Sequence, residues 1–426
     1  MFKEYKSVEL VTPSLLKLRA RAGIGEFCEI TLADGGTSRG RVIAADTDSV
    51  YIRTCGGRIN PSRCAVRFTG TADRLSVSPD MTGRIFDGIG RPADGFGRII
   101  SDVSVRVHGE PQTRKSLPAD CVITGITAID AFSTLLEGQS LTVVVPRGVP
   151  HGEFVSALAT NASPEFGDEK FTVVFAMVGA DSEDLKNYTE DFACTGSFER
   201  TVFISNLAQD SSEAYDTPHT ALAVAEYLAF GCGKRVLCII DGLSEFAGSL
   251  NEYAETVSAA LGEKKIKPDI SAELAAIYAR AGKKEGERGS VTLVSVITEG
   301  DTGESISEIT DKLSDEQIYL SGELYGRGIY PPVDVCSPFA ARRPKEREGH
   351  QIIFSRLAEY YSKGKTARKN TEGGEFTDED RAFADFADGF ENKIITQNLA
   401  RSRTIEQAEA AGQKLLSIIG DFLPKI

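Results

Sequence analysis

Hydrophobic positions follow three successive patterns along the chain. Up to residue 72 the apolar runs are short, as at 27–33, and Gly and Asp residues separate them. Short strands divided by such turns are typical of a small β-barrel. We therefore predict a β-barrel domain over residues 1–72.

The second predicted domain spans residues 73–345, and from about residue 120 to 340 its apolar segments alternate with segments of helical pattern. Five of the apolar segments are predicted strands, at 141–145, 171–178, 202–206, 236–240 and 291–297. Buried strands separated by helices indicate a mostly parallel sheet covered on both faces. Within this domain Thr217 and Pro218 have the order of an N-cap and a first helical residue. Functional residues are expected at the carboxyl ends of the strands.

Residues 346–426 are charged and have a helical pattern. Thr377 with Asp380, and Thr404 with Gln407, have the spacing of capping boxes that open two helices. An apolar stripe at three- and four-residue spacing is formed by Phe383, Phe386, Phe390 and Ile394. Such a stripe is typical of packing within a helical bundle. The fold class is therefore multidomain α+β, with an N-terminal β-barrel, a central α/β domain and a C-terminal helical bundle.

The formal net charge of −14 argues against a general surface for nucleic acid or anionic membrane, since either needs clustered Lys and Arg. Apolar runs are shorter than the roughly 20 residues that span a bilayer, and the first residues lack the apolar core of a secretory signal. We expect a cytoplasmic protein without direct membrane insertion. The eight cysteines and four histidines show no spacing of metal ligands, so no metal site is predicted.

Residues 145–152 read Val-Pro-Arg-Gly-Val-Pro-His-Gly and follow a predicted strand, where a nucleotide-binding domain carries Gly-x-x-x-x-Gly-Lys-Ser/Thr. That loop binds phosphate through backbone N–H groups and the Lys, and its hydroxyl holds Mg²⁺. Here Pro150 has no N–H, His151 replaces the Lys and Gly152 replaces the hydroxyl. Gly148, His151 and Gly152 are the candidate remnants of phosphate binding, which we expect to be weak or absent.

Charge-assisted hydrogen bonds contribute about 1.5–3 kcal/mol each. The loss of two or three of them lowers phosphate affinity by several orders of magnitude. The alternative is that residues 145–150 are an ordinary turn between a strand and a helix, which does not derive from a nucleotide-binding loop.

Several strings, in this order, resemble the non-catalytic B subunit of A/V-type rotary ATPases. They stand at 81–95 (Met-Thr-Gly-Arg-Ile-Phe-Asp-Gly-Ile-Gly-Arg-Pro-Ala-Asp-Gly), 124–131, 148–151, 190–200, 206–210, 217–218, 225–230, 324–334 and 383–387. Each string is weak alone, but their shared order along almost the whole chain is specific. Pro150 and His151 also distinguish this subunit type from its catalytic relatives, which keep Gly-Lys-Thr.

The resemblance implies a RecA-like (P-loop-type) central domain over 73–345 and a hexameric ring in which such chains alternate with catalytic A subunits. It implies ATP or ADP with Mg²⁺ at the interface with the catalytic subunit, and central and peripheral stalk subunits as further partners. The ring would couple ATP synthesis or hydrolysis to proton or sodium transport. No ATPase activity is expected from this chain alone, and it would lie at the membrane through the rotary complex.

In that family the B subunit contributes an arginine in trans, which stabilises charge on the transferring phosphoryl group. The family places it in a Pro-Ser-Leu-Ser-Arg string, whereas residues 336–344 here read Cys-Ser-Pro-Phe-Ala-Ala-Arg-Arg-Pro. Ungapped alignment puts Ala341 at the arginine position. Our hypothesis is that Arg342 takes the role through a one-residue shift, with Arg343 as second choice. The alternative is that the two arginines belong to a solvated linker.

Other candidates carry two interpretations each. Asp241 stands one position before Gly242, where the family register places the Mg²⁺-orienting acid, and it either reaches a metal or starts a turn. Tyr330 either faces a nucleotide or packs the segment that Pro331 and Pro332 keep extended.

Two loops carry pairs of charged residues. Glu199 and Arg200 form either an interface ion pair or a solvated turn. Glu299 and Asp301 have the pattern of loop carboxylates rather than of an acid/base pair.

Two other functions compete with the rotary subunit. An autonomous export ATPase would need a Lys at position 151 and a Ser or Thr at 152, and the chain has neither. A divergent inactive paralogue, acting as an assembly or binding protein, is favoured by the displaced arginine and by a shortened segment at 264–270.

Overall fold

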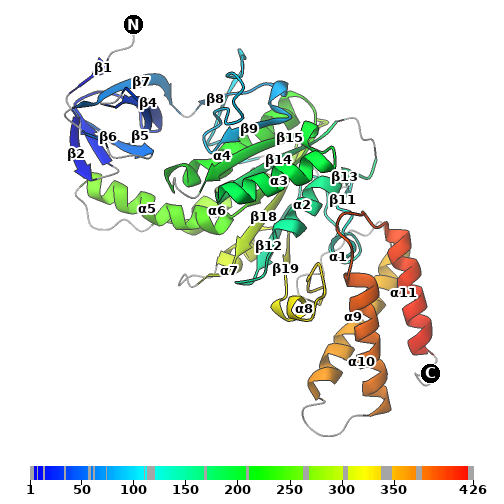
Figure 1. The fold of residues 1–426 in the computed structure, drawn as a ribbon. Helices are drawn as coiled ribbons and strands as arrows, with labels where there is room; N and C mark the ends of the chain where they lie inside the picture. The colour runs from blue at the N-terminus through cyan, green and yellow to red at the C-terminus, as the bar shows by residue number, and fades with distance from the viewer. Residues whose placement is uncertain are drawn as a thin grey trace.

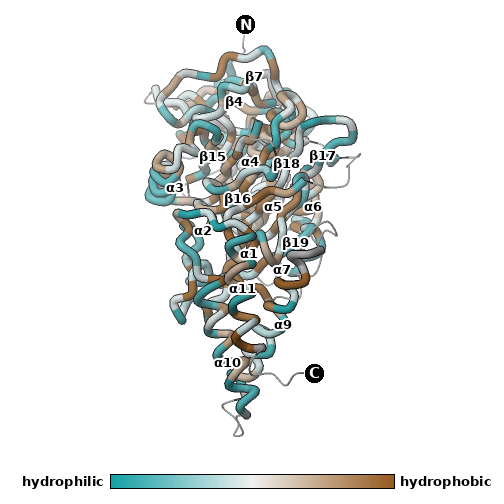
Figure 2. The backbone as a smooth tube through the Cα atoms, turned by 90° about the vertical axis from the view of Figure 1, so that its right-hand side faces the viewer, coloured by the Kyte–Doolittle hydropathy of each residue, from teal (hydrophilic) through white to brown (hydrophobic). Residues whose placement is uncertain are grey.

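The protein consists of a β-domain, a central α/β layer and a group of C-terminal helices, which follow one another along one long axis (Figures 1 and 2). The computed structural model describes residues 4–6, 8–12, 15–32, 35–55, 59–60, 63–72, 74–109, 111–112, 120–166, 170–207, 211–261, 268–300, 306–336, 348–370 and 377–420.

The N-terminal part is a curled antiparallel sheet of seven strands in the order β1-β7-β4-β5-β6-β3-β2. These strands are β1 (Glu4–Tyr5), β2 (Val8–Thr12), β3 (Leu15–Leu18), β4 (Glu26–Thr31), β5 (Thr37–Ala45), β6 (Val50–Cys55) and β7 (Ala65–Ala72). Its interior is apolar and includes Leu16, Ile30, Val42, Ile52 and Val66, each fully buried. Because side chains alternate across each strand, one face fills the interior. The predicted barrel is confirmed as a near-barrel whose outermost strands are β1 and β2.

The central sheet has the strand order β19-β12-β18-β16-β14-β15-β9, and the short β17 (Gly282–Lys283) pairs with β18. Its strands are β9 (Arg84–Asp87), β12 (Ser140–Val145), β14 (Phe171–Ala180), β15 (Thr201–Leu207), β16 (Arg235–Asp241), β18 (Ser290–Thr298) and β19 (Glu316–Tyr319). All pairs are parallel except β17 with β18. The five predicted strands are confirmed. The sequence did not predict the two edge strands, β9 and β19.

Helices cover both faces of this sheet, as predicted. Side chains of α2 (Gly152–Asn161) and α3 (Ser182–Cys194) pack on one face, together with Val143, Phe175 and Ile239. Side chains of α4 (Ser211–Glu226), α5 (Leu243–Leu261) and α6 (Ile270–Tyr278) pack on the other face, with Val174 and Ile240. Successive strand residues therefore belong to different cores, which explains why the strands are apolar throughout.

The predicted start of a helix at Thr217 is wrong. Helix α4 begins at Ser211 and contains Pro218. The Thr217 hydroxyl donates to the Glu213 carbonyl oxygen at 2.7 Å, so it bonds back into the helix instead of capping it. Downstream of the proline the buried residues Ala221 and Leu222 pack on the sheet. This packing outweighs the local preference of proline for a helix start.

The C-terminal helices are α9 (Glu348–Asn370), α10 (Asp378–Phe390), the π-helical turn η6 (Glu391–Ile395) and α11 (Ile405–Gly420). Thr377 and Asp380 form the predicted capping box. Thr404 and Gln407 exchange backbone-to-side-chain hydrogen bonds in the same way at the start of α11. The predicted stripe of Phe383, Phe386, Phe390 and Ile394 is buried in this group of helices, which confirms its packing role.

Candidate functional site

The loop between β12 and α2 joins a buried strand to the start of a helix. Its backbone turns tightly, because the Val149 N–H donates to the Pro146 carbonyl oxygen at 3.1 Å and Gly148 has φ of +84°. His151 is the N-cap residue of α2, but its side chain makes no capping bond. The imidazole is therefore available for another partner.

That partner is Asp241, the last residue of β16. His151 Nε2 lies 3.1 Å from Asp241 Oδ1, and the Tyr188 hydroxyl donates to Asp241 Oδ2 at 2.7 Å. Both carboxylate oxygens of Asp241 thus accept a bond from within the protein. As the turn interpretation predicts, Asp241 ends β16 directly before the turn at Gly242. In addition, it is the common acceptor of the degenerate loop and of α3.

The pair changes the charge state of the histidine. Burial lowers the pKa of His151, but the hydrogen bond and the charge of Asp241, with a smaller contribution from Asp184, outweigh burial and raise the pKa above its ordinary value. Burial raises the pKa of Tyr188 well above its ordinary range, and Asp241 raises it further. Tyr188 therefore stays protonated and remains a donor, while His151 carries more positive charge at neutral pH than the sequence suggested.

Gly242 follows Asp241 and has no room for a side chain. Its φ is +92°, and a Cβ atom added there would lie 2.3 Å from the Val178 carbonyl oxygen of β14. Real Cβ contacts of this length do not occur, so an acid cannot occupy position 242 unless the backbone moves. The acid at the end of β16 therefore stands at Asp241.

A cavity of about 340 Å³ opens beside the loop, at the carboxyl ends of the parallel strands. Its lining includes His151, Tyr188 and three carboxylates, those of Asp184, Asp241 and Glu245, but no Lys or Arg of the described chain. A polyphosphate here would meet these carboxylates without the lysine that a phosphate-binding loop supplies, and the charge of His151 is already paired with Asp241. The residues present do not fit a magnesium nucleotide.

Tyr330 does not line this cavity. It is half-buried and packs against the core that α2 and the C-terminal helices share. Its carbonyl oxygen accepts from the Gln397 N–H at 3.0 Å, and burial, followed by the charge of Glu153, raises the pKa of Tyr330 to about 12. These contacts agree with the packing interpretation.

Of the remaining candidates, Arg200 and Glu299 are not among the residues that line the cavity. Arg200 donates to the Thr160 carbonyl oxygen at 2.8 Å and lies over the Phe171 ring, so it joins its turn to α2 and is not a solvated residue. Glu299 is exposed at the end of β18. Arg342, Arg343, Ala341 and Asp301 lie outside the described residues.

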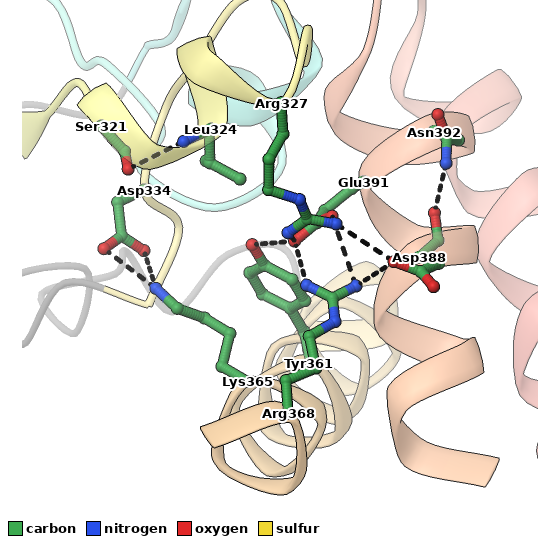
Figure 3. Close-up of polar contacts among 10 residues, drawn as sticks. All are labelled: Ser321, Leu324, Arg327, Asp334, Tyr361, Lys365, Arg368, Asp388, Glu391 and Asn392. Carbon is green, nitrogen blue, oxygen red and sulfur yellow. Dashed lines mark hydrogen bonds and ion pairs between the residues drawn. The ribbon is translucent and has the colours of Figure 1, made fainter. Parts of the chain in front are cut away.

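A second cluster of charges connects the string at 324–334 to the C-terminal helices (Figure 3). The buried Glu391 carboxylate pairs with Arg327 at 2.6 Å and with Arg368 at 2.7 Å, and it accepts the Tyr361 hydroxyl at 3.0 Å. Asp388 joins both arginines from the exposed side. Arg327 follows α8 (Gly322–Gly326), so this cluster fixes the segment after β19 to α9 and α10.

The sequence did not point to Tyr188, Arg327 or Glu391 as site residues. Tyr188 had one signal, since it lies four residues before Phe192 and both are buried on the same face of α3. Glu391 had none, because a glutamate on a charged helix is usually exposed.

The parallel sheet and the strand–loop–helix order at β12 and α2 place the central part in the α/β class that contains nucleotide-binding domains. Residues 125–339 match the model of the ATP synthase alpha/beta family, nucleotide-binding domain. This match covers half of the chain, and the chain belongs to that family.

One solved structure extends the similarity over nearly all of the chain. It is described as the structure of a unique ATP synthase subunit, NeqB, from Nanoarcheaum equitans. The two chains are 25% identical, with a TM-score of 0.72, and the match covers 93% of this chain and 100% of that one.

Two features are absent from the described residues. None of the helices there is long and apolar enough to cross a membrane. In the same part of the chain, His, Cys, Asp and Glu side chains do not gather in any group of three or more that could hold a metal ion.

Proposed function

We propose that this chain is a non-catalytic B-type subunit of a rotary ATP synthase or ion-translocating ATPase of the A/V type. In this proposal it alternates with catalytic A subunits in a hexameric ring that is coupled to proton or sodium transport through central and peripheral stalks. Membership in the ATP synthase alpha/beta family and the similarity to NeqB support the subunit role.

The observation that carries the non-catalytic role is the closed contact of His151 and Tyr188 with Asp241. In a phosphate-binding loop the corresponding lysine pairs with phosphate oxygens and the acid at the end of the neighbouring strand orients Mg²⁺. Here the two positions bind each other, and Pro150 cannot donate an N–H. The chain keeps the scaffold of a nucleotide-binding domain while its own loop lacks the groups for turnover.

In the assembled ring the nucleotide and Mg²⁺ would bind mainly to the catalytic subunit. Arg342 would reach that nucleotide from the side, with Arg343 as second choice. An arginine supplied in trans changes phosphoryl-transfer rates by about 10³–10⁵ on related enzymes.

ATP hydrolysis tests this proposal when it is measured for the chain alone, for its cognate catalytic subunit alone and for their complex. We expect activity only in the complex. Arg342→Ala should lower the rate of hydrolysis by at least about 10³-fold while the complex still forms. Arg343→Ala, at the adjacent position, is the matched comparison variant. Turnover by this chain alone would contradict the non-catalytic role. Full activity of the complex with either variant would show that neither arginine takes part in phosphoryl transfer.

The closed contact at Asp241 also favours a second candidate, a divergent paralogue that binds or assembles other chains without any part in catalysis. This candidate predicts a complex whose hydrolysis rate is unchanged when either arginine is replaced.

A further inference from the structure

The segment that leads from β9 to β10 (Ser104–Arg106) carries large apolar side chains on its surface. Phe96 is 69% exposed, Ile100 is 94% exposed and Val103 is 45% exposed. Three exposed large apolar side chains within one short segment exceed the single scattered ones that are normal on soluble proteins, and such groups mark interaction sites. We refer to Phe96, Arg98, Ile100 and Val103 as the 96–103 surface.

The first half of this surface is held by an ion pair beneath it. Arg84 donates from Nε to Asp94 Oδ2 and from Nη2 to the Gly97 carbonyl oxygen at 3.1 Å. Asp94 in turn accepts the Phe96 N–H at 3.0 Å, and the Arg84 guanidinium lies 5.2 Å from the centre of the Phe96 ring. Its hydrogen bond to Arg84 is the main cause that lowers the pKa of Asp94 to about 2, so the pair persists at any physiological pH.

The second half is fixed by backbone bonds. The Val77 N–H donates to the Val103 carbonyl oxygen at 3.1 Å, and the Val103 N–H donates to Ser101 Oγ at 3.0 Å. Strand β10 then pairs with β8 (Arg74–Ser76). The backbone of this segment is therefore already ordered, so a partner would meet a smaller cost of ordering it.

Arginine is in excess in the hollow beside the surface, while the segment itself also carries one exposed acid, Asp102. A hollow of about 450 Å³ beside it is lined by Arg74, Arg91 and Arg98, with Glu29 as its one carboxylate. Glu29 pairs with Arg67, and Arg91 pairs with Asp87 and Glu213. Arg74 bonds only neutral groups among its printed partners, Ser104 Oγ and the Ser104 carbonyl oxygen. In a chain with a net charge of −14, this local excess of arginine favours a partner with carboxylates.

The place of the surface in the fold indicates which partner it meets. Strand β9 is the last strand of the central sheet, so the segment that follows it lies at a lateral edge of the molecule (Figure 1). A closed ring of alternating chains requires two different lateral faces on each protomer. The 96–103 surface has the position, the apolar content and the charge for one of them.

We propose that the 96–103 surface docks the neighbouring catalytic subunit, on an apolar patch whose rim carries carboxylates. This inference rests on the proposed function, because it takes the ring neighbour as the partner. Ile100 and Phe96 supply the buried contact, and Arg98 supplies the charge at its edge.

The test measures the dissociation constant between the full-length chain and its purified cognate catalytic subunit. Ile100→Asp should weaken binding at least tenfold, because it places a charge in the centre of the contact. Arg98→Glu should weaken binding at low salt and leave a smaller difference at high salt. Ile24→Asp is the matched control, since Ile24 is 64% exposed on the near-barrel and lies outside the surface. Because these residues are exposed, all three variants should keep the unfolding temperature of the parent chain.

The outcomes separate this inference from the proposed function. Loss of binding in Ile100→Asp but not in Ile24→Asp supports the docking surface. Equal binding by all variants overturns the docking surface and leaves the B-type role intact, and equal weakening by Ile100→Asp and Ile24→Asp overturns it as well. If the parent chain does not bind the catalytic subunit at all, both proposals fall.

Discussion

His151 Nε2 lies 3.1 Å from Asp241 Oδ1, so the residue at the position of a phosphate-binding lysine is bonded to the acid that ends β16. In an active phosphate-binding loop the lysine meets phosphate oxygens instead. The pair therefore closes the site electrostatically, since each residue neutralises the other before a ligand arrives.

Asp241→Asn should lower the pKa of His151, because it removes the charge that opposes the effect of burial. A pH titration of the imidazole protons by NMR measures this change directly. Asp184→Asn is the matched control, since Asp184 acts on His151 through charge alone and more weakly. Equal decreases in the two variants would contradict the assignment of Asp241 as the main partner.

The pair should stabilise the fold in a pH-dependent way. The pKa of His151 is raised in the folded state, so its contribution is complete below the unfolded value of about 6.5 and is lost as the pH rises through the folded value. We expect His151→Gln to lower the free energy of unfolding by about 1 kcal/mol at pH 6 and by less at pH 9. Urea titrations at both pH values test the sign, and a larger loss at pH 9 would contradict it.

Gly242→Ala should destabilise the protein by about 2 kcal/mol or more, because the new Cβ atom meets the Val178 carbonyl oxygen and the residue has a left-handed φ. Gly248→Ala is the control. Gly248 lies within α5 with open space around it, so this change should stabilise the protein by roughly 0.5–1 kcal/mol. Thermal unfolding of the two variants should shift in opposite directions, and a common direction would count against the packing argument.

Glu391→Ala should be destabilising by about 2–3 kcal/mol, because Arg327, Arg368 and the Tyr361 hydroxyl lose the buried carboxylate that accepts from them. Asp388→Ala removes the other acid of the cluster, but its side chain is 58% exposed, so the expected loss is below about 1 kcal/mol. Chemical unfolding of both variants measures the difference. Similar losses would show that burial does not set the strength of these pairs.

The sequence was most informative where local chemistry decides the structure. The strands at 141–145 and 236–240, the capping box of Thr377 and Asp380, and the apolar stripe of α10 all follow from the order of neighbouring residues, and each is confirmed. The loss of the lysine and hydroxyl at 151 and 152 was likewise readable, because it concerns residue identity alone.

Tertiary structure decided the features that depend on distant residues. Arg84–Asp87 is a strand only because β15 pairs with it, since its own Gly-rich surroundings favour turns. Likewise, α4 continues through Pro218 because its apolar face packs on the sheet.

The candidate site was likewise predictable from the sequence only in part. The sequence determined what the degenerate loop lacks, since a missing side chain is visible in the chain itself. Only the fold determined what took its place, because Tyr188 and Asp241 reach His151 from other elements. A hydrogen bond between residues 90 positions apart has no local signature, since its energy depends on a distance that only the packed sheet fixes.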